Sequence, residues 1–337
     1  MLTVITPIYN REVLIRDALD SLLRQTSPDW ECLVVDDGST DRSRETVAEY
    51  ARLDPRIRLF SRPNDREKGP SACRNVGFEN AVGDFVFYLD SDDLLEETFC
   101  EHVENQFRED AALDFIGVQC VKFLETVDAL AGRSFEREPH SVPIRTHFLR
   151  RTLDVQSETF CWRKSFLDRF SRHWPEDQRV GEDRVFCYRL LTKECSGAWD
   201  AEKIQVLHRV KSLSHGKADQ LTPRINIEPA LAAERLLTAD RLTEIFRLAG
   251  ELHEENVSLF LDNYLACLRG LLSYRHDALA ADCARHAAAL AEEFHRTDDL
   301  RRIRRYRQMK SLFRFHRIPL VEKSYAAVKR FWKGGRS

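Results

Sequence analysis

The alternation of short apolar runs with amphipathic segments over the first hundred residues is the feature that most constrains the fold. The apolar runs are 2–6, 32–35, 57–60 and 85–89. Strands that are buried on both faces of a sheet have this nearly continuous apolar pattern. Apolar residues recur at helical spacing in 11–25, 44–53 and 71–81. Repeated strand–helix units predict an α/β fold, with a mostly parallel sheet between two layers of helices.

Polar residues collect where the predicted strands end. Tyr9 and Asn10 follow the first strand, residues 36–41 follow the second, and residues 90–93 follow the fourth. In open α/β sheets, ligands bind at the edge formed by the carboxyl ends of the strands. The one-sided placement of these polar residues therefore favours a binding site at that edge.

The second half of the chain has a different pattern. Residues 99–220 are mixed, with a strand-like run at 115–123 and an aromatic-rich run at 159–162. From residue 228 onward the pattern is helical, and it is clearest in 230–237, 256–272 and 278–294. Gly and Pro cluster between these parts, as is typical of a linker. We therefore predict a first domain at 1–218 and a helical C-terminal region at 219–337.

Charge and cysteine usage limit the classes of function. The formal net charge is -3, which lacks the basic signature of a nucleic-acid-binding chain. The nine cysteines are dispersed without a C-x-x-C pair, so the sequence suggests neither a zinc site nor a redox motif. Dispersed cysteines favour a reducing compartment over a secreted scaffold held by disulfides. The sequence has neither a signal-peptide pattern nor an apolar stretch of the roughly 18 residues that a membrane span needs. We expect a cytoplasmic protein without a nucleic-acid partner.

The segment Asp90-Ser91-Asp92-Asp93 has the strongest chemical pattern. Its three carboxylates follow directly after an apolar strand. Carboxylates this close repel one another unless a cation or solvent neutralises them. Mg²⁺ or Mn²⁺ accepts oxygen ligands and would bridge these groups to a diphosphate. The alternative is a solvated turn that caps a helix beginning at Leu94.

Three further segments have both a functional and a structural interpretation. The acidic pair in 36–41 suits hydrogen bonds from a base or a ribose, but this segment can also cap the next helix. Residues 69–77 place Arg74 near a helix start, an arrangement that suits a phosphate or a carboxylate. Glu182 and Asp183 follow Gly181 at a predicted helix start. They complement the helix dipole, or one of them is a general base.

In this order, the segments resemble the motifs of the family 2 inverting glycosyltransferases of the GT-A fold. They are Thr6-Pro7-Ile8-Tyr9-Asn10, residues 34–41, Ala72-Cys73-Arg74-Asn75-x-Gly77, Asp90-Ser91-Asp92-Asp93 and Gly181-Glu182-Asp183. The resemblance covers about residues 1–215. It implies a Rossmann-like, mixed but mostly parallel sheet, a nucleotide-diphospho-sugar donor that commonly carries UDP, and a divalent cation, Mn²⁺ or Mg²⁺.

The resemblance also implies roles on the donor side. Pro7, Tyr9 and Asp37 would line the nucleoside pocket, with Asp37 at the uracil edge. Arg74 would lie beside the base and Asp37. In the acidic segment, Asp90 would be a supporting residue, Asp92 would contact the ribose and the metal, and Asp93 would bind the metal.

On the acceptor side, the resemblance makes Asp183 the catalytic base and Glu182 its neighbour. Asp183 would take the proton of an acceptor hydroxyl as its oxygen attacks the anomeric carbon, and single displacement would invert that carbon. Family members often carry Tyr-Arg-x-His near the end of this domain, but the chain has His208-Arg209-Val210-Lys211. Arg209 and Lys211 would bind the diphosphate, and His208 would approach the metal.

The predicted acceptor is a glycan or a lipid-linked glycan, as in cell-surface polysaccharide synthesis. Basic and aromatic residues alternate from Arg301 to Lys333, a pattern that suits peripheral contact with the inner membrane face or a solvated helix face. A non-catalytic nucleotide-sugar-binding scaffold is the alternative function. A nucleotidyltransferase is disfavoured because residues 6–10 lack a Gly-rich loop with a basic residue.

Overall fold

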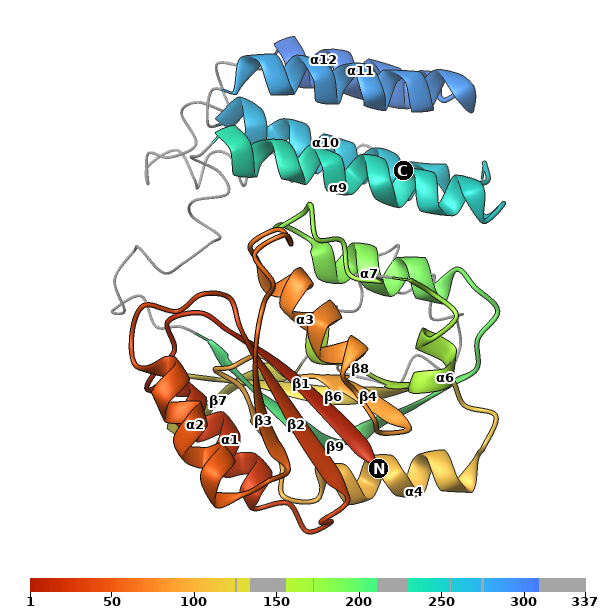
Figure 1. Ribbon diagram of the computed structural model, residues 1–337. Coiled ribbons are helices and arrows are strands. Elements are labelled where there is room, and N and C mark those ends of the chain that lie inside the picture. Colours follow the sequence, from red (N-terminus) through yellow and green to blue (C-terminus); the bar gives the residue numbers. More distant parts are fainter. Residues whose placement is uncertain are drawn as a thin grey trace. The chain divides into compact units, whose positions relative to one another are not determined.

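The chain forms two compact units, Met1–Lys217 and Ala218–Ser337 (Figure 1). The computed structural model describes residues 1–124, 126–133, 156–171, 173–210, 229–254, 256–273 and 276–308. The predicted boundary between 218 and 219 falls outside these described residues, so the assignment of two domains stays a prediction.

A mixed sheet is the centre of the first unit (Figure 1). Its strands are β1 (Leu2–Ile8), β2 (Trp30–Asp36), β3 (Ile57–Ser61), β4 (Phe85–Tyr88), β5 (Leu94–Leu95), β6 (Phe115–Leu124), β7 (Thr126–Arg133), β8 (Phe160–Arg163) and β9 (Gly197–Val210). Their order is β3-β2-β1-β4-β8-β6-β9-β5, and β7 pairs with β6. Strands β3, β2, β1 and β4 run parallel to one another, as the strand–helix repeats predict. Beyond β4 the β8 pairings are antiparallel, as are β6·β7 and β5·β9, whereas β6·β9 is parallel.

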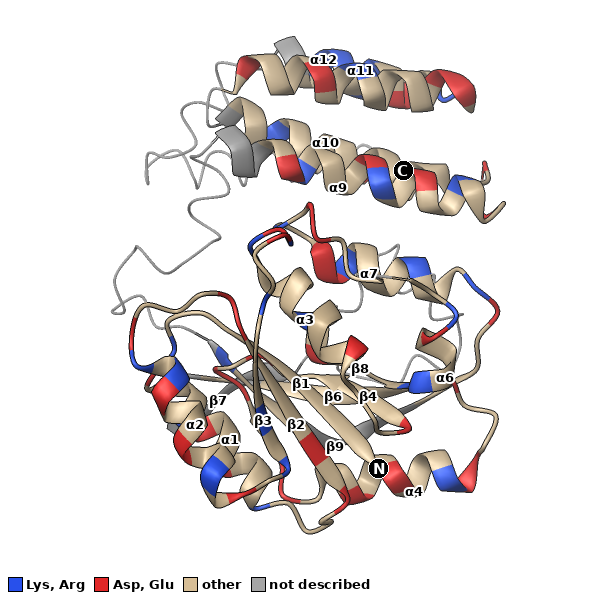
Figure 2. Cartoon of the chain, viewed as in Figure 1, with Lys and Arg blue, Asp and Glu red and all other residues tan. Residues whose placement is uncertain are grey.

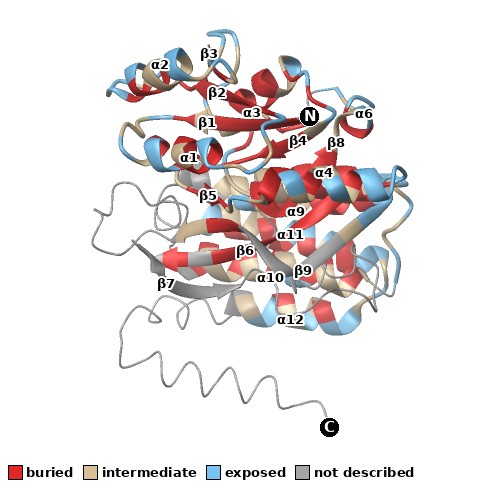
Figure 3. Ribbon diagram, turned by 90° about the horizontal axis from the view of Figure 1, so that it is seen from below, coloured by how far each residue is buried: buried red, intermediate tan, exposed pale blue. Residues whose placement is uncertain are grey.

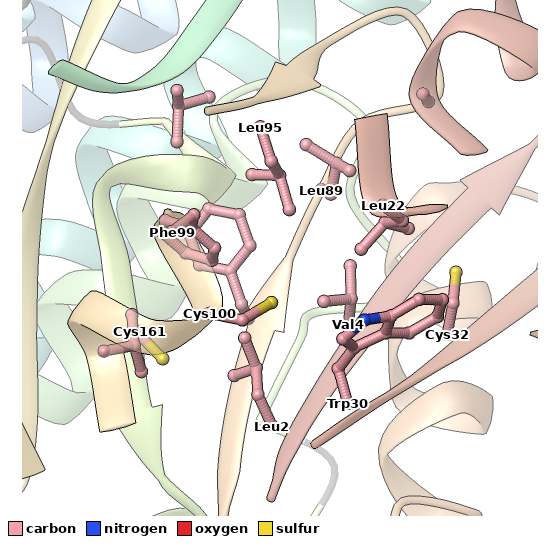
Figure 4. Packing of buried hydrophobic residues seen from close by; sticks show 14 of the residues in the cluster. Leu2, Val4, Leu22, Trp30, Cys32, Leu89, Leu95, Phe99, Cys100 and Cys161 are labelled. Carbon is pink, nitrogen blue, oxygen red and sulfur yellow. The ribbon is translucent and has the colours of Figure 1, made fainter. Parts of the chain in front are cut away.

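Helices cover both faces of this sheet. They are α1 (Leu14–Leu23), α2 (Ser43–Leu53), α3 (Pro70–Glu79), α4 (Phe99–Glu109), α6 (Lys164–Leu167) and α7 (Glu182–Leu191), with a short 3₁₀ turn η1 at Ser157–Thr159. Successive strand residues point to opposite faces. Val4 therefore packs in one core cluster with α1 and α4 (Figure 4), whereas a Cβ on Gly77 of α3 would meet Ile5 on the other face.

The burial of the sheet explains why its strands are legible in the sequence. Strands β1 and β4 contain no Lys, Arg, Asp or Glu (Figure 2), and β2 is buried along its whole length (Figure 3). One difference concerns the segment after β4. Leu94–Leu95 forms a short strand against β9, and the next helix begins only at Phe99. The interpretation of 90–93 as a turn that caps a helix at Leu94 is therefore wrong.

The second unit is helical, as predicted. Its helices are α9 (Pro229–Leu248), α10 (Val257–Ser273), α11 (Asp277–Glu293) and α12 (Thr297–Gln308). Phe246 of α9 packs edge to face on Phe260 of α10, and both rings are buried. Among the helices that the structure describes, none is long and apolar enough to cross a membrane. The basic and aromatic tail beyond residue 308 lies outside the described residues.

Candidate functional site

The ends of β1 and β2 bring Pro7, Tyr9 and Asp37 together. Pro7 is paired with Val35 in the parallel register, and the Asp37 amide donates to the Ile8 carbonyl at 2.9 Å. Tyr9 is 43% exposed, and the Lys68 ammonium lies 3.9 Å from the centre of its ring. The three predicted nucleoside-pocket residues therefore share one edge of the sheet.

The cation beside Asp37 is Arg62. Its Nε donates to Asp37 Oδ1 at 2.5 Å, and the Gly69 amide donates to the same oxygen at 3.2 Å. The carboxylate is thus held facing the loop that leads into α3. The resemblance implied that Arg74 would lie beside Asp37, whereas the side-chain hydrogen bonds of Arg74 go to Asp90 and Ser157. Arg62 directly follows β3, so the strand-end rule could have found it.

Arg74 is buried among carboxylates. Its Nη2 donates to Asp90 Oδ1 at 2.7 Å and to Ser157 Oγ at 3.2 Å, and its Nη1 lies 3.9 Å from Glu182 Oε1. Burial by itself would raise the pKa of Asp90, but the charge of Arg74 outweighs it and the pKa is lowered. Arg74 therefore joins the acidic segment after β4 to the first turn of α7.

Trp174 covers the guanidinium of Arg74, and Asn75 fixes its backbone. The Trp174 ring centre lies 4.3 Å from the guanidinium carbon, within the range of a cation–π contact. Asn75 Nδ2 donates to the Trp174 carbonyl at 3.0 Å, and Asn75 Oδ1 accepts from its amide at 3.1 Å. The indole also stacks on Phe186 of α7, with ring centres 4.0 Å apart. These contacts tie α3 to α7.

Glu182 and Asp183 form the acidic start of α7 (Figure 2). Gly181 precedes them with φ of 71°, a left-handed conformation that glycine adopts without strain. Burial, with a contribution from Asp183, raises the pKa of Glu182 to about 8. Burial also raises the pKa of Asp183, although the Arg184 amide and side chain oppose the shift. A carboxylate with a raised pKa is a stronger base, which suits proton abstraction near neutral pH.

Asp93 and His208 come together with a residue that the sequence did not predict, Glu158. His208 Nδ1 lies 2.8 Å from Asp93 Oδ2, and the Arg209 amide donates to Asp93 Oδ1 at 2.8 Å. One ligand atom from each of Asp93, Glu158 and His208 falls within 4.8 Å of the others. Glu158 lies in η1, in the stretch without a recognisable motif, and its position directly before an aromatic-rich strand was its only signal.

The donor set fits a hard divalent cation. Asp93 and Glu158 are 0% and 1% exposed. Glu158 Oε2 accepts no hydrogen bond from any described residue. Burial raises the pKa of Asp93 to about 6, against the opposing effect of His208. Two adjacent buried carboxylates, one with an unpaired oxygen, are costly unless a cation lies between them.

Two of the remaining predicted residues lie beside this group. Arg209 Nε donates to the Asp92 carbonyl at 3.0 Å, and its Nη2 donates to Asp17 Oδ2 at 2.7 Å. Burial is the main cause of the raised pKa of Asp93, and the hydrogen bond to Asp93 overcomes burial and raises the pKa of His208; the charge of Asp92 makes a smaller contribution in the same direction to each. Lys211, the other predicted diphosphate ligand, lies outside the described residues.

With this geometry in view, residues 3–171 match the family described as "Glycosyl transferase family 2". The chain belongs to glycosyl transferase family 2. Both the predicted family and the predicted fold class are therefore confirmed.

A curated relative and two solved structures of similar fold each match most of the chain. The uncharacterized glycosyltransferase EpsJ of Bacillus subtilis is 28% identical over 238 residues, which cover 68% of this chain and 65% of that relative. The crystal structure of S. aureus TarS 1-349 with UDP-GlcNAc has a TM-score of 0.55 at 19% identity, with 91% of each chain covered. The mannosyltransferase PcManGT of Pyrobaculum calidifontis, in complex with GDP-Man and Mn²⁺, has a TM-score of 0.52 at 18% identity, covering 98% of this chain and 87% of that one.

Proposed function

We propose that this family 2 protein is an inverting, metal-dependent glycosyltransferase of the hexosyltransferase type. It would move a sugar from a nucleotide-diphospho-sugar, most simply a UDP-sugar, to a glycan or a lipid-linked glycan. The observation that carries this proposal is the chain of contacts through Asp90. Its side chain binds Arg74, which reaches Glu182, and its backbone amide donates to Glu158 Oε1 at 3.1 Å. The carboxylates proposed to bind the cation are thereby connected to Glu182, the neighbour of the proposed base Asp183.

The donor would lie along the carboxyl edge of the sheet. Asp37, oriented by Arg62, accepts hydrogen bonds and so suits the N–H edge of a uracil, while Tyr9 offers an exposed ring for stacking. Asp93 and His208, with Asp92 beside them, would hold the divalent cation. Arg209 and Lys211 would contact the diphosphate. Of the two solved structures of similar fold, one is a complex with UDP-GlcNAc and the other with GDP-Man, so the nucleotide has to be measured.

The reaction is one displacement. The acceptor hydroxyl oxygen forms a bond to the anomeric carbon while the bond from that carbon to the diphosphate oxygen breaks. Asp183 takes the hydroxyl proton, and the raised pKa of this group suits that step. Arg74 holds Glu182 beside Asp183. The cation, when bound, neutralises the charge that builds up on the departing diphosphate.

The proposed location is the cytoplasm, with peripheral contact at the inner membrane face during synthesis of a surface polysaccharide. The basic residues at the end of α12 support this only in part. Arg302 is engaged with Asp299 and Asp262 at 2.7 Å each, so it belongs to the helical unit itself. Arg304 and Arg305 of the same helix are exposed, so the proposed membrane contact would use them together with the basic residues after 308.

The test is nucleotide release from a panel of UDP-, GDP- and dTDP-sugars, with and without Mn²⁺. Metal-dependent release from one donor, lost in Asp93→Ala and in Asp183→Asn, supports the transferase. Asp168→Asn is a matched control, because Asp168 is 48% exposed and its ion pair within the described chain is with Lys164. Donor binding without turnover over a broad acceptor panel would instead favour a nucleotide-sugar-binding scaffold.

A further inference from the structure

The surroundings of Glu158 are not explained by a structural role alone. Its side chain is 1% exposed, and Oε1 accepts the Asp90 amide at 3.1 Å. A glutamine would accept that hydrogen bond equally well and would bury no charge. The second oxygen, Oε2, meets no donor among the described residues. Burial raises the pKa of Glu158 well above its ordinary value, so this oxygen needs either a proton or a cation as its partner.

The positions of Asp93 and His208 suggest what that ligand is. Two neighbouring ligand atoms of an octahedral cation with bonds of about 2.1 Å lie about 3 Å apart. Asp93 Oδ2 and His208 Nδ1 are 2.8 Å apart and share a hydrogen bond, whose proton would leave when an ion binds both atoms, and Glu158 contributes an oxygen within 4.8 Å of both. The three atoms are thus close enough that small side-chain shifts would let them bind one ion.

Each ligand is held in place by contacts of its own. Asp93 is fixed by the Arg209 amide at 2.8 Å, and its own amide donates to the Asp90 carbonyl at 3.1 Å. His208 lies on β9, which is paired with β5 and β6. Glu158 is held through the Asp90 amide. A site with preorganised ligands binds its ion without a large cost of ordering.

We propose that Glu158 is a third protein ligand, and that Asp93, Glu158 and His208 bind Mn²⁺ in the absence of the sugar donor. This proposal deepens the proposed function by naming a metal ligand and the order in which metal and donor bind. Only the role of the ion in the reaction rests on the proposed function. The imidazole nitrogen favours Mn²⁺ over Mg²⁺, which keeps several waters and is usually bound through one or two carboxylates.

The experiment titrates Mn²⁺ into the metal-free full-length protein without nucleotide and follows the electron paramagnetic resonance of free Mn²⁺. The wild-type protein should bind one Mn²⁺, and a large excess of Mg²⁺ should displace it poorly. Glu158→Gln should weaken Mn²⁺ binding at least about tenfold, since even loss of an outer partner of a metal ligand costs that much. Glu31→Gln is the matched control. Glu31 is also a buried carboxylate, but it lies near the start of β2, away from the strand ends that carry the site.

A thermal readout separates a ligand from a structural residue. Mn²⁺ should raise the Tm of the wild-type protein, because a ligand that binds only the native state stabilises it. Metal-free Glu158→Gln should melt no lower than metal-free wild type, and its Tm should respond little to Mn²⁺. Unchanged Mn²⁺ affinity in Glu158→Gln would overturn the proposal.

The proposal also stands or falls on the wild-type protein alone. If wild-type protein binds Mn²⁺ only after UDP is added, the three-ligand site is refuted even where the Glu158→Gln variant does not fold. Neither result decides whether the protein is a transferase, because donor turnover is measured separately. The two ideas can therefore fail independently.

Discussion

The contact between Asn75 and the backbone of Trp174 allows a quantitative prediction. Asn75→Ala removes two hydrogen bonds of 3.0 and 3.1 Å and leaves the amide and carbonyl of the buried Trp174 without partners. Each buried unpaired group costs about 1–3 kcal/mol. The third bond of Asn75 goes to Glu176, which solvent reaches, so its loss adds little. Water entering the vacated space offsets part of the sum, and we expect a loss of about 2–4 kcal/mol in the free energy of unfolding.

The assay is urea unfolding followed by circular dichroism, with Asn80→Ala as the control. Asn80 lies at the end of the same helix, and its side chain donates to the Val76 carbonyl at 2.9 Å. That variant should lose less than about 1 kcal/mol. Because Trp174 covers Arg74, Asn75→Ala should also lower kcat/KM more than its residual folded fraction explains. Equal losses of stability in the two variants would refute the reasoning.

Three further predictions concern the site and its support. Asp183→Asn should lower kcat about 10²–10⁴-fold while calorimetric UDP affinity stays within about twofold, and a matching loss of UDP affinity would contradict its role as base. The folded state holds the pKa of Glu182 near 8 against an ordinary 4.5, so the native protein binds more protons than the unfolded chain and loses stability as pH rises between these values. Glu182→Gln should therefore flatten the fall of Tm over that pH range, and an unchanged slope would count against it. Gly77→Ala would force a Cβ into Ile5 and should cost about 1–3 kcal/mol in the same urea assay, whereas a neutral change would show that α3 can move away from β1.

Local sequence patterns predicted the parallel half of the sheet and the residues at its edge. The runs that became β1, β2 and β4 are recognisable because both faces of these strands are buried, which forces nearly continuous apolar sequence. Asp37 directly follows β2, and Asp93 lies in the acidic segment after β4. Their placement at one edge follows from parallel pairing alone, so the sequence was sufficient for it.

Partners of the site residues were harder to predict because they depend on long-range register. Glu158 meets Asp93 only because η1 leads into β8, which pairs antiparallel with β4 and β6. Nothing in residues 156–163 specifies those neighbours. The position of Arg74 on a helix was predictable, but the carboxylate that it faces depends on how α3 packs on the sheet. The predicted roles in donor binding and catalysis stay predictions.

The pairing of Asp93 with His208 joins residues 115 positions apart in the chain. The stretch that matches the family ends at residue 171 and includes Asp93 and Glu158, but it stops short of both Asp183 and His208. A nascent chain of that length would have the residues proposed for the nucleoside pocket, but it would lack His208 of the proposed cation site and Asp183, the proposed base. The proposed activity should therefore appear only after β9 has left the ribosome and folded. A fragment trimmed to residues 3–171 should be inactive.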